Sequence, residues 1–204
     1  MNEALKAALI DKIVKAIADN ADDLTKLDQA IGDGDHGVNM KRGFEAIALE
    51  KENLIGLNDA DALQKAGMTL VMKVGGASGP LYGSLLMGMA KAAKVGHDVE
   101  GQLSEGVEAV KKRGKSDVGA KTMLDVLVPV QATLREHHRL SKPELIVAVR
   151  QTANEAREAT KDMLATRGRA SFLGERSIGH YDPGATSCRL LIEAICDVVE
   201  AHFG

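Results

Sequence analysis

Apolar side chains recur every three or four residues along most of this chain, and that spacing places them on one face of an α-helix. In the first such segment the stripe consists of Leu5, Leu9, Ile13, Ile17 and Leu24. No segment shows the alternation of apolar and polar residues that is typical of a half-buried strand. The pattern predicts eight helices, at about residues 2–29, 39–51, 59–73, 80–93, 102–113, 121–138, 141–165 and 182–202. An all-α protein is therefore expected.

The amino-acid composition indicates what kind of all-α protein this is. The 204 residues suit one domain, so a single domain covering residues 1–204 is expected. Aromatic residues make up only 2% of the chain and Trp is absent, so the core must consist of Ala, Leu, Ile, Val and Met. The low aromatic content, the lack of a long basic run and the net charge of −3 argue against nucleic-acid binding.

Cysteine content and hydropathy predict a cytoplasmic protein. Cys188 and Cys196 are the only cysteines, too few for a disulfide framework or a four-cysteine zinc site. They lie on one expected helix, about 12 Å apart along its axis, and should not pair with each other. The first residues, MNEALKAALIDKI, contain acids and differ from a signal peptide. No stretch reaches the roughly 18 apolar residues of a membrane span, so no membrane contact is expected.

An acidic, glycine-rich stretch interrupts the helical pattern early in the chain. Residues 31–37 read Ile-Gly-Asp-Gly-Asp-His-Gly, and Asp28 lies just upstream of Asp33 and Asp35. Glycine and Asp both disfavour a helix interior. Two interpretations fit the stretch equally well by itself. It is either a solvated turn that caps the next helix, or a site where carboxylates bind a hard divalent cation such as Mg²⁺ or Ca²⁺.

Topology gathers the unusual segments at one place. Short links favour antiparallel neighbours, so the first, third, fifth and seventh connections of eight helices share one end. These connections are residues 31–38, 74–80, 114–120 and 166–184. The same rim presents four helix N-termini, whose unpaired N–H groups favour anions. Carboxylates for a cation beside N–H groups for an anion are suited to a Mg²⁺–nucleotide.

Two common nucleotide and cation motifs do not account for this rim. The glycine stretch lacks the Lys and the Ser or Thr of a P-loop, and no strand precedes it. Asp33 and Asp35 have the alternation of an EF-hand loop, but the later calcium ligands of that loop are missing.

Four motifs in a fixed order carry a more specific signal. They are Leu27-Asp28-x-x-Ile31-Gly-Asp-Gly-Asp-His-Gly37-x-Asn39-Met40, Gly75-Gly-Ala-Ser-Gly-Pro80, Gly119-x-Lys121-Thr122-Met123-x-Asp125, and Gly168-Arg-Ala-Ser171 followed by Asp182-Pro-Gly-Ala185. Over essentially the whole chain, this order resembles the nucleotide-binding DhaL subunits of dihydroxyacetone kinases. The resemblance implies a closed up-and-down barrel of eight antiparallel helices, with the nucleotide site at one rim.

The resemblance also implies roles for particular residues. Asp28, Asp33 and Asp35 would bind Mg²⁺, with two ions expected, against the phosphates of ADP or ATP. No residue is assigned a catalytic role beyond this site. The residues expected along the nucleotide are His36, Gly37, Val38, Asn39, Ala77, Ser78, Gly119, Thr122, Met123, Arg169, Asp182, Pro183 and Gly184.

For a stand-alone chain, the resemblance implies a phosphotransferase subunit that keeps Mg-ADP as a coenzyme. Its expected partners are a phosphohistidine subunit of the phosphoenolpyruvate-dependent phosphotransferase system and a dihydroxyacetone-binding kinase subunit. Two alternatives stay open: an ATP-dependent kinase subunit for another small keto-sugar, and a non-catalytic nucleotide-binding regulatory module. A homodimer also stays open.

Overall fold

The computed structural model describes residues 1–203, and within that range the protein consists of helices and connections with no β-strand. The predicted all-α class is confirmed. The α-helices are α1 (Glu3–Asp19), α2 (Ala21–Ile31), α3 (His36–Leu49), α4 (Lys51–Gly56), α5 (Asp59–Lys73), α6 (Ser78–Lys94), α7 (Val99–Gly114), α8 (Leu124–Glu136), α9 (Lys142–Ala159) and α10 (Pro183–Phe203). Two 3-10 helices, η1 (Thr160–Asp162) and η2 (Arg169–Ser177), lie between α9 and α10.

The predicted count of eight helices is wrong for the described residues, which form ten α-helices. The expected helix 2–29 is divided at Asn20, whose φ of −108° and ψ of 8° leave the helical region. The Asn20 side chain donates to the carbonyl of Ala16 at 2.8 Å, a local bond that competes with helix continuation. The other addition is α4, where a plain link was expected; its Leu54 is buried and anchors this short helix.

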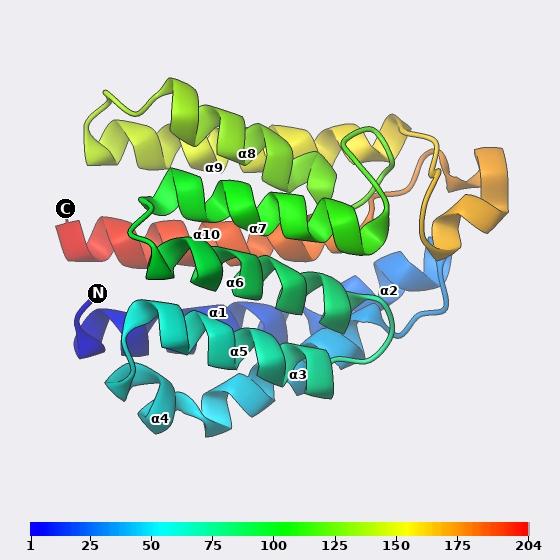
Figure 1. The fold of residues 1–204 in the computed structure, drawn as a ribbon. Helices are drawn as coiled ribbons and strands as arrows, with labels where there is room; N and C mark the ends of the chain where they lie inside the picture. The colour runs from blue at the N-terminus through cyan, green and yellow to red at the C-terminus, as the bar shows by residue number, and fades with distance from the viewer. Residues whose placement is uncertain (204) are drawn as a thin grey trace.

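Neighbouring helices pack in one continuous order. In this order α1 contacts α3, α3 contacts α5, and each helix from α5 to α9 contacts the next helix in the chain. The last helix, α10, packs back against α1. Figure 1 shows these helices running alongside one another, with the N-terminus and the C-terminus at the same end.

The core between the helices is aliphatic, as the composition predicts. Ile17, Leu24, Met40, Leu70 and Val126 are each at most 1% exposed. Burying one such side chain contributes about 1.5–3 kcal/mol, so these contacts dominate the stability of the fold. No helix within residues 1–203 combines the length and the apolar character that a membrane crossing requires.

Glycine allows an especially close approach of α5 and α6. A β-carbon at Gly83 would meet the side chain of Val71 and lie 2.8 Å from the carbonyl oxygen of Gly67. We expect Gly83→Ala to lower the free energy of unfolding by about 1–3 kcal/mol, because the added methyl overpacks this crossing. Urea denaturation measures the change. Gly56→Ala is the control, since nothing lies within 4 Å of a β-carbon there; equal stability of the two variants would contradict the expectation.

The two ends of the helical array differ in chemistry. Figure 1 shows four connections at one end, residues 32–35, 74–77, 115–123 and 160–182, which we call the loop end. The other end, the terminal end, contains α4, residues 95–98 and 137–141, and both termini. The four segments predicted to share a rim are therefore at the same end of the structure.

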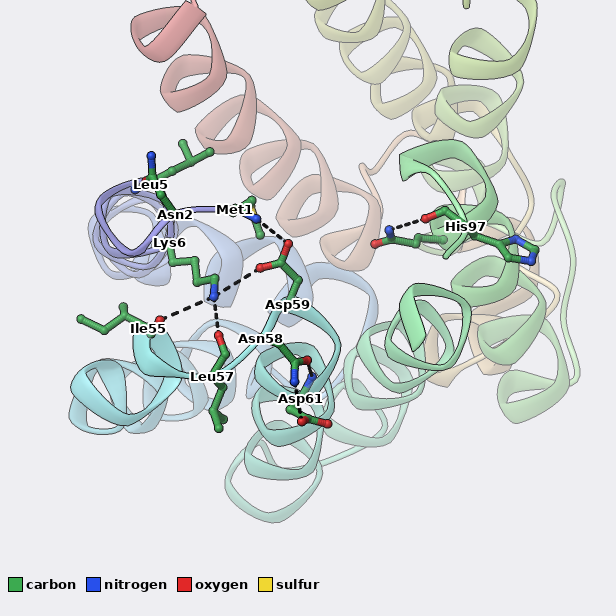
Figure 2. A network of polar contacts seen from close by, with 11 residues as sticks. Met1, Asn2, Leu5, Lys6, Ile55, Leu57, Asn58, Asp59, Asp61 and His97 are labelled. Carbon is green, nitrogen blue, oxygen red and sulfur yellow. Dashed lines mark hydrogen bonds and ion pairs between the residues drawn. The ribbon is translucent and has the colours of Figure 1, made fainter. Parts of the chain in front are cut away.

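A buried lysine connects helices at the terminal end. Lys6, on α1, has an exposed fraction of only 8%. Its ammonium donates to the carbonyl oxygens of Leu57 and Ile55 and lies 3.3 Å from a carboxylate oxygen of Asp59 (Figure 2). These contacts tie α1 to the segment between α4 and α5, far from the loop end.

Candidate functional site

Three carboxylates meet at the loop end. Asp28 lies in the last turn of α2, and Asp33 and Asp35 lie in the loop that leads to α3. One oxygen from each carboxylate lies within 4.8 Å of the other two. Oxygen ligands of this kind are those that Mg²⁺ and Ca²⁺ prefer, so the donor set fits a hard divalent cation. We call these three residues the Asp trio.

The acidic loop is both a capped turn and a cluster of converging carboxylates. Asp28 Oδ2 accepts hydrogen bonds from the backbone N–H groups of Asp35, at 2.9 Å, and His36, at 3.1 Å. These bonds satisfy donors at the start of α3. Gly34 has a φ of +75°, a conformation that glycine adopts without strain. The two interpretations of the sequence are thus compatible, because one carboxylate caps the helix while all three converge.

A positive charge faces the trio from the long connection. Arg169 Nε lies 2.8 Å from Asp33 Oδ2, although Arg169 is separated from Asp33 by most of the chain. In residues 1–203 no other cationic side chain forms an ion pair with the trio. The pair is 70% and 38% exposed at its two side chains, so it is worth at most about 1 kcal/mol by itself. Its importance lies in placing a cation beside the carboxylates.

His36 is held in a buried polar network. Its Nδ1 lies 2.9 Å from Ser78 Oγ and its Nε2 lies 2.9 Å from Ser187 Oγ. Ser187 Oγ is also 2.8 Å from the hydroxyl of Tyr82 and donates to the carbonyl of Gly184. Burial lowers the pKa of His36, against the opposing effect of the Asp28 and Asp35 charges. A neutral imidazole therefore links α3, α6 and α10, and both of its nitrogens are engaged.

Ser187→Ala tests this network. The substitution leaves His36 Nε2 and the Tyr82 hydroxyl without their shared partner in a buried environment. Unsatisfied buried groups cost about 1–3 kcal/mol, so we expect a loss of that size in the free energy of unfolding. Thermal and urea unfolding measure it. Ser171→Ala, at a half-buried position in η2 where water can replace the one bond from the hydroxyl to the carbonyl of Gly168, should change stability by less than about 0.5 kcal/mol. A similarly small loss at Ser187 would refute the role of the network.

The glycine loop between α5 and α6 approaches the trio closely. Gly76 has a φ of +63°, and a β-carbon there would lie 3.8 Å from both carboxylate oxygens of Asp35. Asn39 Oδ1 accepts a hydrogen bond from Arg42, which also donates to the carbonyl of Lys73 and so fixes the start of the loop. The chain then enters α6 at Ser78, with Ala77 as the preceding cap residue. Backbone N–H groups of a helix start are thereby brought beside the carboxylates.

The segment before α8 is shaped by Asp125, which is only 2% exposed. Its Oδ1 accepts from the N–H of Gly119 at 2.5 Å, and its Oδ2 accepts from the N–H of Thr122 at 2.7 Å. The helix expected from residue 121 begins at Leu124 instead, because Lys121 has a φ of +62°. Thr122 and Met123 therefore lie in a turn at the loop end.

The long connection ends at another buried carboxylate. Asp182 Oδ2 accepts from the N–H of Ala185 at 2.6 Å and caps α10, whose first residue is Pro183. Burial raises the pKa of Asp182 to about 7, and the negative charges of Asp125 and Asp28 add to that effect. The hydrogen bond from Ala185 opposes it.

Gly37 and Val38, two of the predicted nucleotide neighbours, have structural features that do not depend on a nucleotide. A β-carbon at Gly37 would collide with the carbonyl of Ala21 and the hydroxyl of Thr25, so this glycine permits α2 and α3 to touch. Val38 is 59% exposed on the outer side of α3. Lys121 and Asp125 belong to the third motif of the sequence but were expected to have no role of their own; two opposite charges within six residues of Gly119 were the available signal.

Converging carboxylates, glycine loops and helix starts at one end of a helical protein are the arrangement expected of a class of proteins that bind a divalent cation together with an anion. Comparison with known proteins is more specific. The chain belongs to the DAK2 domain family, whose model matches residues 30–197.

Individual relatives agree with this family. The chain is 46% identical over 183 residues to the "PEP-dependent dihydroxyacetone kinase 1, ADP-binding subunit DhaL" of Listeria innocua, covering 88% of each protein. It is 43% identical over 182 residues to the Escherichia coli "PEP-dependent dihydroxyacetone kinase, ADP-binding subunit DhaL", covering 84% of this chain and 85% of that protein.

A solved structure agrees as well. The dihydroxyacetone kinase of C. freundii in complex with AMP-PNP and Mg²⁺ matches 95% of this chain with a TM-score of 0.78 and 25% identity. This chain spans 34% of that longer protein.

Proposed function

We propose that this chain is the ADP-binding subunit of a phosphoenolpyruvate-dependent dihydroxyacetone kinase. In that function ADP, bound with Mg²⁺, takes a phosphoryl group from a phosphohistidine protein and passes it to dihydroxyacetone on a separate subunit. The juxtaposition of the Asp trio with the glycine loop at Gly76 carries the proposal. The names of the Listeria and Escherichia relatives support the nucleotide and the donor.

The proposed site divides into a metal part and a phosphate part. The Asp trio would hold Mg²⁺, and two ions are proposed because three carboxylates and the phosphates of ADP concentrate more negative charge than one divalent ion offsets. The starts of α3, α6 and α10 would offer N–H groups to the phosphates. The residues proposed along the nucleotide are His36, Gly37, Val38, Asn39, Ala77, Ser78, Gly119, Thr122, Met123, Arg169, Asp182, Pro183 and Gly184.

Positioning and charge are what phosphoryl transfer requires of the protein. Arg169 adds a positive charge beside Asp33, and Asp28 fixes the backbone of the acidic loop. We infer that α1, α3 and α5 to α10 close into a barrel of eight antiparallel helices, since their contacts run in sequence and return to α1. Such a closed frame would keep the four connections of the loop end in register.

The partners of the reaction are proposed to be other chains. Both nitrogens of His36 contact hydroxyl groups, so this histidine is engaged in the network and does not serve as a phosphate carrier. The phosphohistidine phosphotransferase subunit and the dihydroxyacetone-binding kinase subunit would then supply the reactive histidines. A cytoplasmic location follows from this proposal, and light scattering would test whether the chain also forms a homodimer.

Nucleotide carried through purification tests the proposal directly. We expect the protein purified in Mg²⁺ to release adenine nucleotide on heat denaturation, detected by ion-exchange chromatography, and to hold about two Mg²⁺ by elemental analysis. Absence of nucleotide, together with none retained after incubation with Mg-ADP, would refute nucleotide binding.

An ATP-dependent kinase subunit is the second candidate, because the C. freundii structure contains AMP-PNP. The two candidates differ in the donor. Reconstitution with the substrate subunit and dihydroxyacetone, supplied either with ATP or with the phosphohistidine protein, separates them. Product formed with ATP alone would favour the second candidate.

A further inference from the structure

Lys121 is a buried cation that the proposed chemistry leaves unused. It is 1% exposed and lies in the turn between Gly119 and α8, with a φ of +62° that non-glycine residues rarely adopt. Burial lowers its pKa, while the negative charges of Asp182 and Asp162 oppose that shift. A charge is retained in such a place only where several polar partners compensate for the lost water.

Its partners all belong to the long connection. Lys121 Nζ donates to the carbonyl of Met163 at 3.1 Å and to the carbonyl of Ser177 at 2.5 Å. These two carbonyls bracket the segment 163–177, which includes η2 and Arg169. One ammonium group therefore closes the base of this segment.

Further hydrogen bonds join the same two parts of the chain. The N–H of Thr166 donates to the carbonyl of Ala120 at 3.2 Å, and Arg167 Nε donates to the carbonyl of Lys115 at 2.8 Å. Within the segment, the fully buried Ser177 hydroxyl accepts from the N–H of Ala165 and donates to the carbonyl of Gly174. The base of the segment is thus bonded repeatedly to residues 115–121.

The middle of the segment has few such hydrogen bonds and is held on one side by a small apolar cluster, in which Ala170 and Leu173 pack with Ala165 and with Ile31 of α2. Phe172 is 87% exposed, and the Arg169 side chain is 70% exposed where it reaches Asp33. An exposed ion pair is too weak to hold the segment by itself. The position of Arg169 beside the Asp trio consequently depends on this apolar cluster and on how firmly the base, which includes Ala165, is held.

We propose that Lys121 is a positioning residue that fixes the 163–177 segment, and through it Arg169, against the Asp trio, so that bound Mg-ADP is retained. This inference rests on the proposed function. It assigns to Lys121 an indirect action, because its ammonium contacts the segment and has no contact with the trio.

The chain offers a matched comparison in Lys6. Both lysines are buried and both donate to two backbone carbonyls, but Lys6 does so at the terminal end (Figure 2). Lys6→Met and Lys121→Met therefore remove the same buried group at opposite ends of the fold, and Lys6→Met also removes an ion pair with Asp59, so its effect on stability should be at least as large. An effect that comes only from lower stability should therefore appear in both variants.

The release of a fluorescent ADP analogue in Mg²⁺, chased with excess ADP in a stopped-flow instrument, measures the proposed effect. We expect Lys121→Met to release the analogue at least about tenfold faster than the wild type. Lys6→Met should remain within about twofold of the wild-type rate. Equal rates for Lys121→Met and the wild type would overturn the proposal.

A double-mutant cycle with Arg169→Ala separates positioning from general damage. If Lys121 acts through Arg169, Lys121→Met should accelerate release by less than about threefold in the Arg169→Ala background. The same tenfold factor in both backgrounds would contradict this route. Trypsin should also cleave at Arg167, Arg169 and Arg176 faster in Lys121→Met than in Lys6→Met, and equal cleavage would count against the proposal.

Ser177→Ala covers the case in which Lys121→Met does not fold. It removes a hydroxyl that ties the base of the segment and leaves the lysine in place, and we expect faster release of the analogue as well. Unchanged release from folded Ser177→Ala would overturn the proposal. A wild-type protein that fails to bind the analogue would instead refute the proposed function, so the two failures are distinguishable.

Discussion

Asp33→Asn is expected to reduce Mg²⁺-dependent ADP affinity by at least about 100-fold. The substitution removes one of three converging carboxylates and replaces a charged oxygen ligand with a neutral amide. It also removes the partner of Arg169 Nε. Calorimetric titration of ADP in the presence of Mg²⁺ measures the loss.

The same variant should fold normally without metal. Three clustered negative charges repel one another, so removing one of them offsets the loss of an exposed ion pair. We expect the free energy of unfolding of the metal-free protein to change by less than about 1 kcal/mol. Binding would therefore be lost while stability is kept.

Asp23→Asn is the matched control. Asp23 is exposed on α2 and pairs with Lys26 on the surface, so this variant has the same change of charge away from the trio. It should bind Mg-ADP with wild-type affinity. If Asp33→Asn also binds ADP within about threefold of the wild type, the Asp trio is not the metal site.

Asp182→Asn is expected to change the pH dependence of stability. An Asp in the unfolded chain titrates near 3.9, whereas the Asp182 pKa in the folded protein is raised to about 7 by burial. Between these values the folded state binds more protons than the unfolded state. The contribution of Asp182 to the free energy of unfolding therefore falls as pH rises from about 4 to 8, through the folded pKa, and is constant above that range.

The asparagine variant lacks this titration and keeps a side-chain oxygen for the N–H of Ala185. Its stability relative to the wild type should therefore increase by about 2 kcal/mol between pH 5.5 and pH 8, since each pKa unit corresponds to about 1.4 kcal/mol. Urea denaturation of the metal-free proteins across this range measures the difference. Asp162→Asn, an exposed carboxylate in the same connection, serves as the control. Parallel pH profiles for Asp182→Asn and the wild type would contradict the expectation.

Much of the fold could be predicted because it depends on local pattern and on connection length. Apolar spacing located the long helices, and alternation of connections placed the acidic loop and the Arg169 connection at one end. The residues at which a helix is interrupted or starts late were harder to predict. Asn20 interrupts the first helix through a side-chain bond to Ala16, and Lys121 adopts a left-handed conformation where a helix start was expected.

The site could be predicted only as a set of loops. The Asp trio lies within eight residues of sequence, and its convergence follows from the tight turn at Gly34. The contacts between distant residues have no local signal. His36 meets Ser187 across 151 positions, and Lys121 meets Ser177 across 56, because helix packing decides which carbonyls and hydroxyls a buried polar group can reach.

Transfer through the bound coenzyme tests the central claim most directly. The chain would be loaded with Mg-ADP, freed of excess nucleotide, and mixed with the dihydroxyacetone-binding subunit, dihydroxyacetone and a large molar excess of the phosphohistidine protein, which supplies one phosphoryl group for each product molecule. We predict that dihydroxyacetone phosphate accumulates to many times the amount of bound ADP, and that Asp33→Asn in place of the wild type abolishes it. Product formation that proceeds equally with this variant, or without the chain, would contradict the claim.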